Sequence, residues 1–367
     1  MKVLFIGEFS NVHLHLKEGL EKLGHEVLLI THDGGWRKYY SDVKLTRKSS
    51  TIFDSLSYLF SLIKILPQLK NFDVVQINNP VSFFQLKAPK NQLIYDYLKR
   101  RNKKIFMAGY STDYFWIKAC VEDKIFRYSE FMIGEELVEN EHIKTDIREW
   151  TNPEKKDVNI HIAHTCDGIV TCLYEYYAAY INHFPDKTTF IPLPINISSL
   201  RRESKKRNQE KIKIFIGIQK QKNQLKGTDI MLKALERVHE KYPDEVEVIK
   251  AESVPYLEYE KMINSADVLL DQLYSYTPAM NALMAMAKGI VVVGGGEPEN
   301  YEIIHETQLR PIINVLPCEE DVYNKLESLV LNKNEIPRLS EESIEYVKRH
   351  HDHVKVAQQY VDFWESK

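Results

Sequence analysis

The sequence predicts an α/β protein built of two Rossmann-like, doubly wound domains. Apolar runs that suit buried strands alternate with stretches of helical periodicity, and this alternation stops once and then restarts. The length of 367 residues also favours two domains over one outsized core. We expect the two domains to face a cleft at the carboxyl ends of their sheets, where open α/β sheets bind ligands.

The first domain is predicted over residues 1–200. Val3 to Ile6 is a continuous apolar run, helically spaced apolar residues follow it, and Val27 to Ile30 is apolar again. A strand, a helix and a strand of this length open a parallel sheet. Further strands and helices are expected at 52–69, 74–77, 92–101, 104–107, 168–171, 174–180 and 188–191.

The second domain is predicted over residues 201–340. Residues 201–211 are polar, charged and without apolar periodicity, which is typical of a linker. The alternation then restarts with a strand at 212–217 and continues through strands and helices at 229–239, 246–249, 256–266, 268–270, 278–288 and 290–293. The final residues, 341–367, read as a helical segment with an apolar face that can pack back on the first domain.

Composition and charge exclude several classes of protein. The 49 Lys and Arg against 52 Asp and Glu give a net charge of −3 and no general attraction for nucleic acid. The first apolar run is too short for a signal peptide, and no later one approaches the roughly 18 residues that span a bilayer. We therefore expect a cytoplasmic protein. No spacing of His, Cys or carboxylates suits a metal site, so neither a metal nor a cofactor is predicted.

A helix predicted to open near Thr277 is the first candidate binding feature. Thr277 suits the N-cap, Pro278 the first helical position and Gly289 the stop. Such a helix directs its backbone amides and the positive end of its dipole toward the cleft, which favours a diphosphate. The alternative is an ordinary buried helix of a doubly wound sheet.

A basic loop after the strand that ends at Gly217 is the second candidate. It contains Lys220, Lys222 and Lys226, and Gly227 opens the next helix. Lysines at this position can offset the charge of a leaving diphosphate. The alternative is a solvated basic loop.

Three segments of the second half, in order, carry a family resemblance. Lys226–Gly227, Ala266–Val268 and Met284–Val292 resemble the nucleotide-sugar half of retaining glycosyltransferases of the GT-B type, family four. Gly24–Val27 and Phe190–Asn196 are similar to landmarks of that family's first domain. The resemblance implies metal-independent transfer, with retention, from a nucleotide-sugar donor to a saccharide or lipid-linked acceptor on the first domain's side. It also implies a role in cell-surface polysaccharide or glycoconjugate synthesis.

The resemblance and the loop positions together assign site residues. Asp113 is the candidate beneath the transferred sugar, although it also suits the cap of a helix beginning at Tyr114. Lys226 is the second catalytic candidate, at the leaving diphosphate. The donor-binding residues predicted on these grounds are Gly7, Glu8, Lys220, Lys222, Val254, Tyr276, Thr277, Pro278, Asn281 and Met284.

The sequence departs from the family pattern at the donor site. Two glutamates that the family carries with seven residues between them correspond to Tyr276 and Met284, and an arginine corresponds to Ile218. Each lost carboxylate removes charge-assisted hydrogen bonds of about 1.5–3 kcal/mol. Glu297 and Glu299 can supply a replacement, or can belong to a turn-rich surface loop. A catalytically silent sugar-nucleotide-binding protein and a non-hydride sugar-nucleotide epimerase therefore remain alternatives.

Residues 83–104 form the strongest basic and aromatic stretch. Seven Lys and Arg are interleaved there with Phe, Leu and Tyr side chains. Such a face can make peripheral contact with the inner face of a membrane. The alternative is a helix packed on the sheet with a charged outer side.

Overall fold

The computed structural model describes residues 1–32, 40–47, 49, 51–200, 211–219 and 223–367. The chain divides into two compact units. Unit 1 comprises Met1–Glu122, Lys144–Pro194 and His353–Lys367, and unit 2 comprises Asp123–Ile143 and Ile195–Asp352. Each unit is built on a parallel sheet, which confirms the predicted α/β fold of two Rossmann-like domains.

This division differs from the predicted ranges 1–200, 201–340 and 341–367 in two places. Asp123–Ile143 belongs to unit 2, because its polar and aromatic side chains bind residues of that unit. The segment predicted as one helical region, 341–367, lies in two helices that divide between the units near Asp352. Most of the predicted linker, 201–210, lies outside the described residues.

Unit 1 contains a seven-stranded parallel sheet of order β3-β2-β1-β4-β5-β8-β9. Its strands are β1 (Lys2–Ile6), β2 (Glu26–His32), β3 (Val43–Leu45), β4 (Val74–Ile77), β5 (Lys104–Gly109), β8 (Gly168–Thr171) and β9 (Thr188–Phe190). Its helices are α1 (Val12–Lys22), α2 (Ile52–Ile65), α3 (Ala88–Arg101), α4 (Tyr114–Ile117), α5 (Glu141–Thr151), α6 (Pro153–Thr165), α7 (Tyr174–Ile181) and α15 (His353–Ser366). Shorter helical turns are η1 (Leu66–Gln68) and η2 (Lys118–Glu122).

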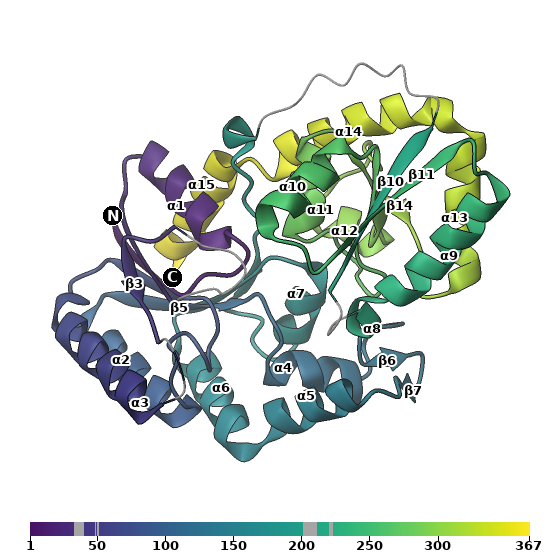
Figure 1. Ribbon diagram of the computed structural model, residues 1–367. Coiled ribbons are helices and arrows are strands. Elements are labelled where there is room, and N and C mark those ends of the chain that lie inside the picture. Colours follow the sequence, from purple (N-terminus) through teal and green to yellow (C-terminus); the bar gives the residue numbers. More distant parts are fainter. Residues whose placement is uncertain (33–39, 48, 50, 201–210, 220–222) are drawn as a thin grey trace. The chain divides into compact units, whose positions relative to one another are not determined.

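Helices cover both faces of this sheet. Figure 1 shows α1 and α15 side by side on one face, and α2, α3 and α6 on the other. Gly19 permits the close approach of α1 to α15, since a Cβ there would lie 2.2 Å from the carbonyl oxygen of His353. Val3, Phe5 and Phe106 of the strands form one core cluster with Tyr360 and Trp364 of α15.

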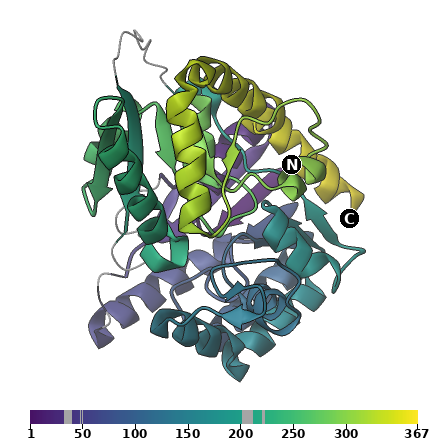
Figure 2. The ribbon, with the colours of Figure 1, turned by 90° about the vertical axis from the view of Figure 1, so that its right-hand side faces the viewer.

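Unit 2 contains a five-stranded parallel sheet of order β11-β10-β12-β13-β14 and a two-stranded hairpin. Its strands are β10 (Ile212–Ile218), β11 (Val246–Glu252), β12 (Val268–Leu270), β13 (Val291–Gly294) and β14 (Ile313–Asn314), with β6 (Met132–Ile133) and β7 (Glu136–Leu137) in the hairpin. Its helices are α8 (Asn223–Lys226), α9 (Thr228–Lys241), α10 (Tyr256–Ser265), α11 (Met280–Ala287), α12 (Pro298–Ile303), α13 (Glu319–Leu331) and α14 (Ile336–His350), and the short turns are η3 (Ile197–Ser199) and η4 (Lys333–Glu335). Helices α9 and α13 pack together on one face of the sheet (Figure 2).

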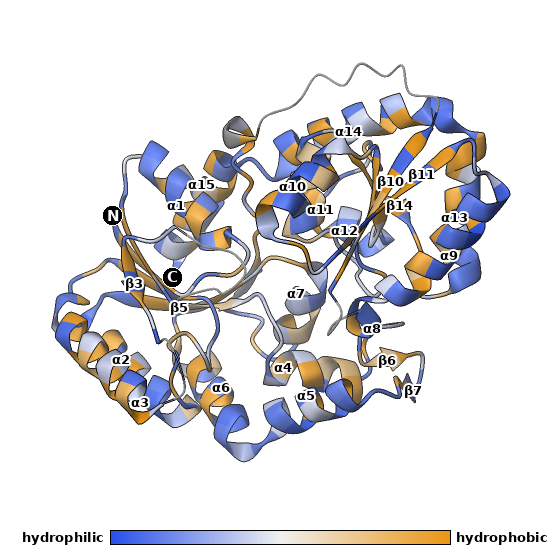
Figure 3. Ribbon diagram, in the orientation of Figure 1, coloured by the Kyte–Doolittle hydropathy of each residue, from blue (hydrophilic) through white to orange (hydrophobic). Residues whose placement is uncertain are grey.

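No helix among the described residues is long and apolar enough to cross a membrane. The strands form the apolar centre of each unit, as their orange colour in Figure 3 shows. The carboxyl ends of the parallel strands meet at one edge of each sheet, and the residues that follow them form the candidate sites.

Candidate functional site

The carboxyl edge of the unit 2 sheet brings several predicted residues together. Parallel pairing aligns β10 with β12 and β12 with β13, so the loops after these strands lie at the same edge. Lys226 follows β10, Asp271 and Tyr276 follow β12, and Glu297 follows β13. These loops therefore define the candidate site of unit 2.

Lys226 and Gly227 tie the end of α8 to the end of β12. The Lys226 carbonyl oxygen accepts the backbone N–H of Leu273 at 2.9 Å. Gly227 has a φ of +65°, and a Cβ there would lie 2.5 Å from the Leu273 side chain. A glycine is therefore required directly after Lys226, which explains this part of the sequence motif.

Helix α11 begins two residues later than the sequence predicts. It spans Met280–Ala287 with Ala279 at the N-cap, so the assignment of Thr277 as N-cap and of Pro278 as first helical residue is wrong. The Ser275 hydroxyl donates to the Thr277 carbonyl at 2.5 Å and holds Thr277 in a buried turn before the helix. Ala279 carries no side-chain acceptor for the first helical amides.

Asn281 lies in the first turn of α11 and links it to the end of β12. Its Nδ2 donates to Asp271 Oδ1 at 3.0 Å, and its Oδ1 accepts the Tyr259 hydroxyl at 3.2 Å. Burial raises the pKa of Asp271, while Asn281 and the nearby Lys226 lower it. The Asn281 side chain thus links Asp271, at the end of β12, to the first turn of α11.

Tyr276 contacts the segment Asp123–Ile143, which enters unit 2 from an earlier part of the chain. The Tyr276 hydroxyl oxygen accepts the backbone N–H groups of Arg127 at 2.8 Å and Tyr128 at 3.4 Å. The Tyr128 ring stacks on the Tyr276 ring with centroids 4.8 Å apart, and the Arg127 guanidinium lies 4.9 Å from its centroid. Tyr276 is consequently only 2% exposed.

Glu297 and Glu299 bind the same segment. Glu297 is buried and accepts Arg127 Nη2 at 2.9 Å, the Tyr128 hydroxyl at 2.7 Å and Asn314 Nδ2 at 2.9 Å. Arg127 also pairs in a bidentate manner with Glu299, at 2.5 and 3.1 Å. Burial raises the pKa of Glu299, but the Arg127 guanidinium outweighs it, and the net pKa lies below the usual value. Both glutamates serve to hold Arg127.

The corresponding edge of unit 1 is occupied by its own carboxyl groups. Gly7 has a φ of +86°, and its Cβ position is filled by the Asn78 side chain. Glu8 accepts the backbone N–H groups of Phe9, His13 and Leu14 at 2.7, 3.2 and 2.9 Å, so it fills the amino end of α1. Burial raises the pKa of Glu8 to about 7 against the opposing effect of these amides.

Asp113 caps α4, which is the alternative that the sequence left open. Its Oδ1 accepts the Trp116 backbone N–H at 2.9 Å, and its Oδ2 accepts the Tyr180 hydroxyl at 2.5 Å. The side chain is 1% exposed, and burial raises its pKa to about 6. Its contact with a transferred sugar stays a prediction.

The remaining predicted residues are placed as follows. Val254 follows β11, and Met284 is half-buried in α11. Lys220 and Lys222 lie outside the described residues. Across the described ranges, which omit 33–39, 48, 50, 201–210 and 220–222, the structure holds no group of three or more His, Cys, Asp or Glu that suits a metal ion.

Arg127 and Tyr128 are site residues that sequence reasoning missed. They lie about 150 residues before their partners, and nothing in the local pattern of 123–143 indicates the unit on which it packs. The signal that could have indicated such partners was the pair of glutamates next to a strand end. Glutamates that become buried there require a cation or hydrogen-bond donors from another part of the chain.

Comparison with known proteins places the fold. The sequence matches no protein-family model, and no curated protein is significantly similar to it. The structure is similar to sucrose-phosphate synthase from Thermosynechococcus elongatus, with a TM-score of 0.64 and 13% identity over 100% of this chain and 98% of that chain. It is also similar to Anabaena HepE in complex with UDP-glucose, with a TM-score of 0.59 and 12% identity over 100% of both chains.

A third similar structure is a candidate UDP-N-acetylglucosamine 2-epimerase from Listeria monocytogenes. Its TM-score is 0.56 at 12% identity, over 98% of this chain and 94% of that chain. At such identities the likeness establishes the fold, which is the GT-B fold of two Rossmann-like domains found in nucleotide-sugar glycosyltransferases.

Proposed function

We propose that this chain is a glycosyltransferase that moves a sugar from a nucleotide-sugar donor to a saccharide or lipid-linked acceptor. The start of α11 carries the proposal. Its N-cap, Ala279, contributes no side-chain acceptor, and Lys226 follows the neighbouring strand β10, whose carboxyl end lies at the same edge of the sheet. Helix amides beside a lysine suit the diphosphate of a nucleotide sugar.

The proposed chemistry assigns the leaving group to unit 2. The bond between the sugar C1 and the diphosphate oxygen breaks, and the nucleoside diphosphate leaves with the electron pair. The acceptor hydroxyl oxygen bonds to C1, and its proton passes to the leaving diphosphate. Lys226 and the α11 amides stabilise the charge that develops on that diphosphate, a task that a divalent cation performs in other enzymes.

The finer assignments rest on the family resemblance. We place the donor at Val254, Asn281 and Met284 of unit 2, and the acceptor on unit 1. Retention at C1, a role in cell-surface polysaccharide or glycoconjugate synthesis, and activity in the cytoplasm without metal or cofactor belong to the same proposal.

A panel of ligands tests the proposal directly. Thermal unfolding is recorded with UDP, ADP, GDP and dTDP and their glucose conjugates, with and without Mg²⁺, because a bound ligand raises the melting temperature by mass action. UDP and UDP-glucose come first, since HepE was solved with UDP-glucose. We expect one base to raise the melting temperature independently of Mg²⁺. A flat panel at millimolar ligand contradicts the donor site.

A catalytically silent nucleotide-sugar-binding protein is the second candidate. The observation in its favour is that Tyr276 and Glu297 bind Arg127 and Tyr128, so neither is presented to a donor. Incubation of the bound donor with and without saccharide acceptors separates the two functions. Transfer or acceptor-stimulated release of nucleoside diphosphate supports the enzyme, and binding with an unchanged donor supports the silent protein. An isomerised sugar formed from donor alone identifies an epimerase.

A further inference from the structure

Helix α2 presents an unusual apolar surface. Five of the fourteen large apolar side chains that are exposed among the described residues belong to it, namely Ile52, Phe53, Leu56, Phe60 and Ile63. Phe53 is 86% and Phe60 71% exposed. Their spacing places all five on one side of the helix, opposite the buried Tyr58 and Leu62.

The surroundings of this α2 face are cationic. Residues 52–104 contain nine Lys and Arg, three Asp and no Glu, a net charge of +6 in a chain whose total is −3. Lys90, Arg100 and Arg101 are exposed on one side of α3, together with Leu93. The end of α3 lies against the turn that follows α2, because the Tyr97 hydroxyl donates to the Leu66 carbonyl at 3.3 Å.

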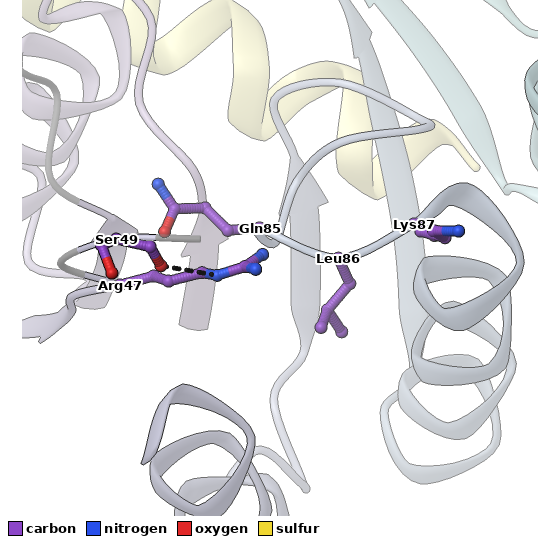
Figure 4. Close-up of a pocket in the computed structure, with 5 residues that line it drawn as sticks. All are labelled: Arg47, Ser49, Gln85, Leu86 and Lys87. Atoms are coloured by element: carbon purple, nitrogen blue, oxygen red, sulfur yellow. Dashed lines mark hydrogen bonds between the residues drawn. The ribbon is translucent and has the colours of Figure 1, made fainter. Parts of the chain in front are cut away.

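A pocket lies beside the first turn of α2. It is lined by Arg47, Ser49, Gln85, Leu86 and Lys87, with the Arg47 Nε–H donating to the Ser49 carbonyl at 3.2 Å (Figure 4). Arg47 also donates to the Ser55 hydroxyl of α2 at 2.7 Å, and the Gln85 backbone N–H donates to the Tyr58 hydroxyl at 3.0 Å. Two cations and backbone polar groups thus border the apolar face.

We propose that α2 docks unit 1 onto an anionic lipid surface, with its apolar face among the acyl chains and the cations of α3 and the pocket at the headgroup phosphates. Exposed aromatic and aliphatic side chains favour the interfacial region of a bilayer, and surrounding lysines and arginines favour anionic headgroups. The exposed cations Lys90, Arg100 and Arg101 argue against a second copy of the same surface, because like charges repel each other. This inference is independent of the proposed function, since it uses no donor-site residue.

Vesicle flotation of the full chain tests the inference. Vesicles of phosphatidylcholine alone are compared with vesicles that contain about one third phosphatidylglycerol, at about 0.1 M and about 0.5 M salt. We expect at least tenfold tighter binding to the anionic vesicles, lost at the higher salt. The double variant Phe53→Ser/Phe60→Ser should lose binding by at least tenfold, and Arg100→Glu/Arg101→Glu should remove the preference for phosphatidylglycerol.

The matched control removes two exposed apolar side chains elsewhere. Leu257 and Leu331 of unit 2 are 72% and 65% exposed, and Leu257→Ser/Leu331→Ser should bind vesicles as the unaltered chain does. Unchanged thermal unfolding shows that each variant is folded. Failure to bind anionic vesicles, or equal binding by Phe53→Ser/Phe60→Ser, overturns the proposal. A dimer in solution that Phe53→Ser/Phe60→Ser converts to monomer, without vesicle binding, assigns the face to a second copy instead.

Discussion

The carboxyl edges of the two sheets differ in how the first backbone amides of a nearby helix are satisfied. In unit 1 the chain supplies its own acceptor, because the Glu8 carboxyl group fills the amino end of α1. In unit 2 the helix α11 begins at Ala279, whose side chain supplies no acceptor. A helix start at the carboxyl edge of the sheet is therefore structural at α1 of unit 1 and suited to an external anion at α11 of unit 2.

The two edges also differ in how their carboxylates are satisfied. Asp113 and Glu8 are held by amides and a hydroxyl of nearby elements in unit 1. Glu297 and Glu299 in unit 2 are held by Arg127. Arg127 belongs to Asp123–Ile143, a segment of unit 2 that lies between two stretches of unit 1 in the sequence. Changes at the two edges should consequently have different readouts, catalytic in unit 2 and conformational in unit 1.

The largest expected effect is on turnover in unit 2. Lys226→Ala should lower kcat by about 10²–10³-fold with little change in folding, because it removes a charge from the developing diphosphate. The control is Lys325→Ala, an exposed lysine of α13. Steady-state transfer assays with the donor identified by thermal unfolding measure the effect. Equal activity of the two variants would show that the anion site lies elsewhere.

The next effect is on the stability of unit 2. Arg127→Ala leaves Glu297 buried without its cation and should lower the free energy of unfolding by about 2 kcal/mol. Far-UV circular dichroism during denaturation, with limited proteolysis of 123–143, measures it. Lys124→Ala in the same segment removes only an exposed pair with Glu135 and should cost less than about 1 kcal/mol. If both variants resist protease like the unaltered chain, Arg127 does not hold segment 123–143 on unit 2.

A smaller effect is expected in unit 1. Glu8→Ala removes the acceptor for three amides at the start of α1 and should lower the free energy of unfolding by about 1 kcal/mol. The tryptophans of the described part of the chain, Trp116, Trp150 and Trp364, all belong to unit 1, so their fluorescence follows this unit. The control Glu26→Ala, at an exposed pair with Lys2, should change stability by less than about 0.5 kcal/mol. Equal free energies of unfolding for Glu8→Ala and Glu26→Ala would show that Glu8 does not cap α1.

The smallest effect is a change in pH dependence. Burial raises the pKa of Glu8 from 4.5 to about 7 and that of Asp113 from 3.8 to about 6. The folded state keeps protons that the unfolded state has released, so unit 1 loses stability as the pH rises through this range. Glu8→Gln should make the decline between about pH 5 and pH 7 shallower in tryptophan-monitored denaturation. A decline as steep as that of the unaltered chain would contradict the assignment.

The sequence predicts the sheets well and the loop geometry poorly. Apolar runs such as Val3–Ile6 and Val291–Val293 are buried strands in the structure, because only a two-sided parallel sheet buries a continuous run. The first residue of α11 was predicted at Pro278 from residue preferences. The hydrogen bond from Ser275 to the Thr277 carbonyl stabilises a turn before the helix, and the helix begins at Met280. Residue propensities alone do not predict such a turn.

Long-range contacts account for the rest. Lys226 and Asn281 were predicted from motifs, and the structure brings both to Asp271. Tyr276 was predicted at the donor, yet its hydroxyl binds Arg127 and Tyr128, which precede it by nearly 150 residues. A pairing of this kind depends on the tertiary fold, because no local periodicity encodes which unit a distant segment will join.

Helix α15 has a consequence for how the chain folds during synthesis. Tyr360 and Trp364 of α15 complete the core that contains Val3 and Phe5 of β1. This core therefore cannot form until α15 has been synthesised. Unit 2, whose residues end at Asp352, leaves the ribosome before that helix does. The usual amino-to-carboxyl order of domain folding is thus reversed, with the sheet of unit 1 exposing one apolar face to chaperones until translation has passed Trp364.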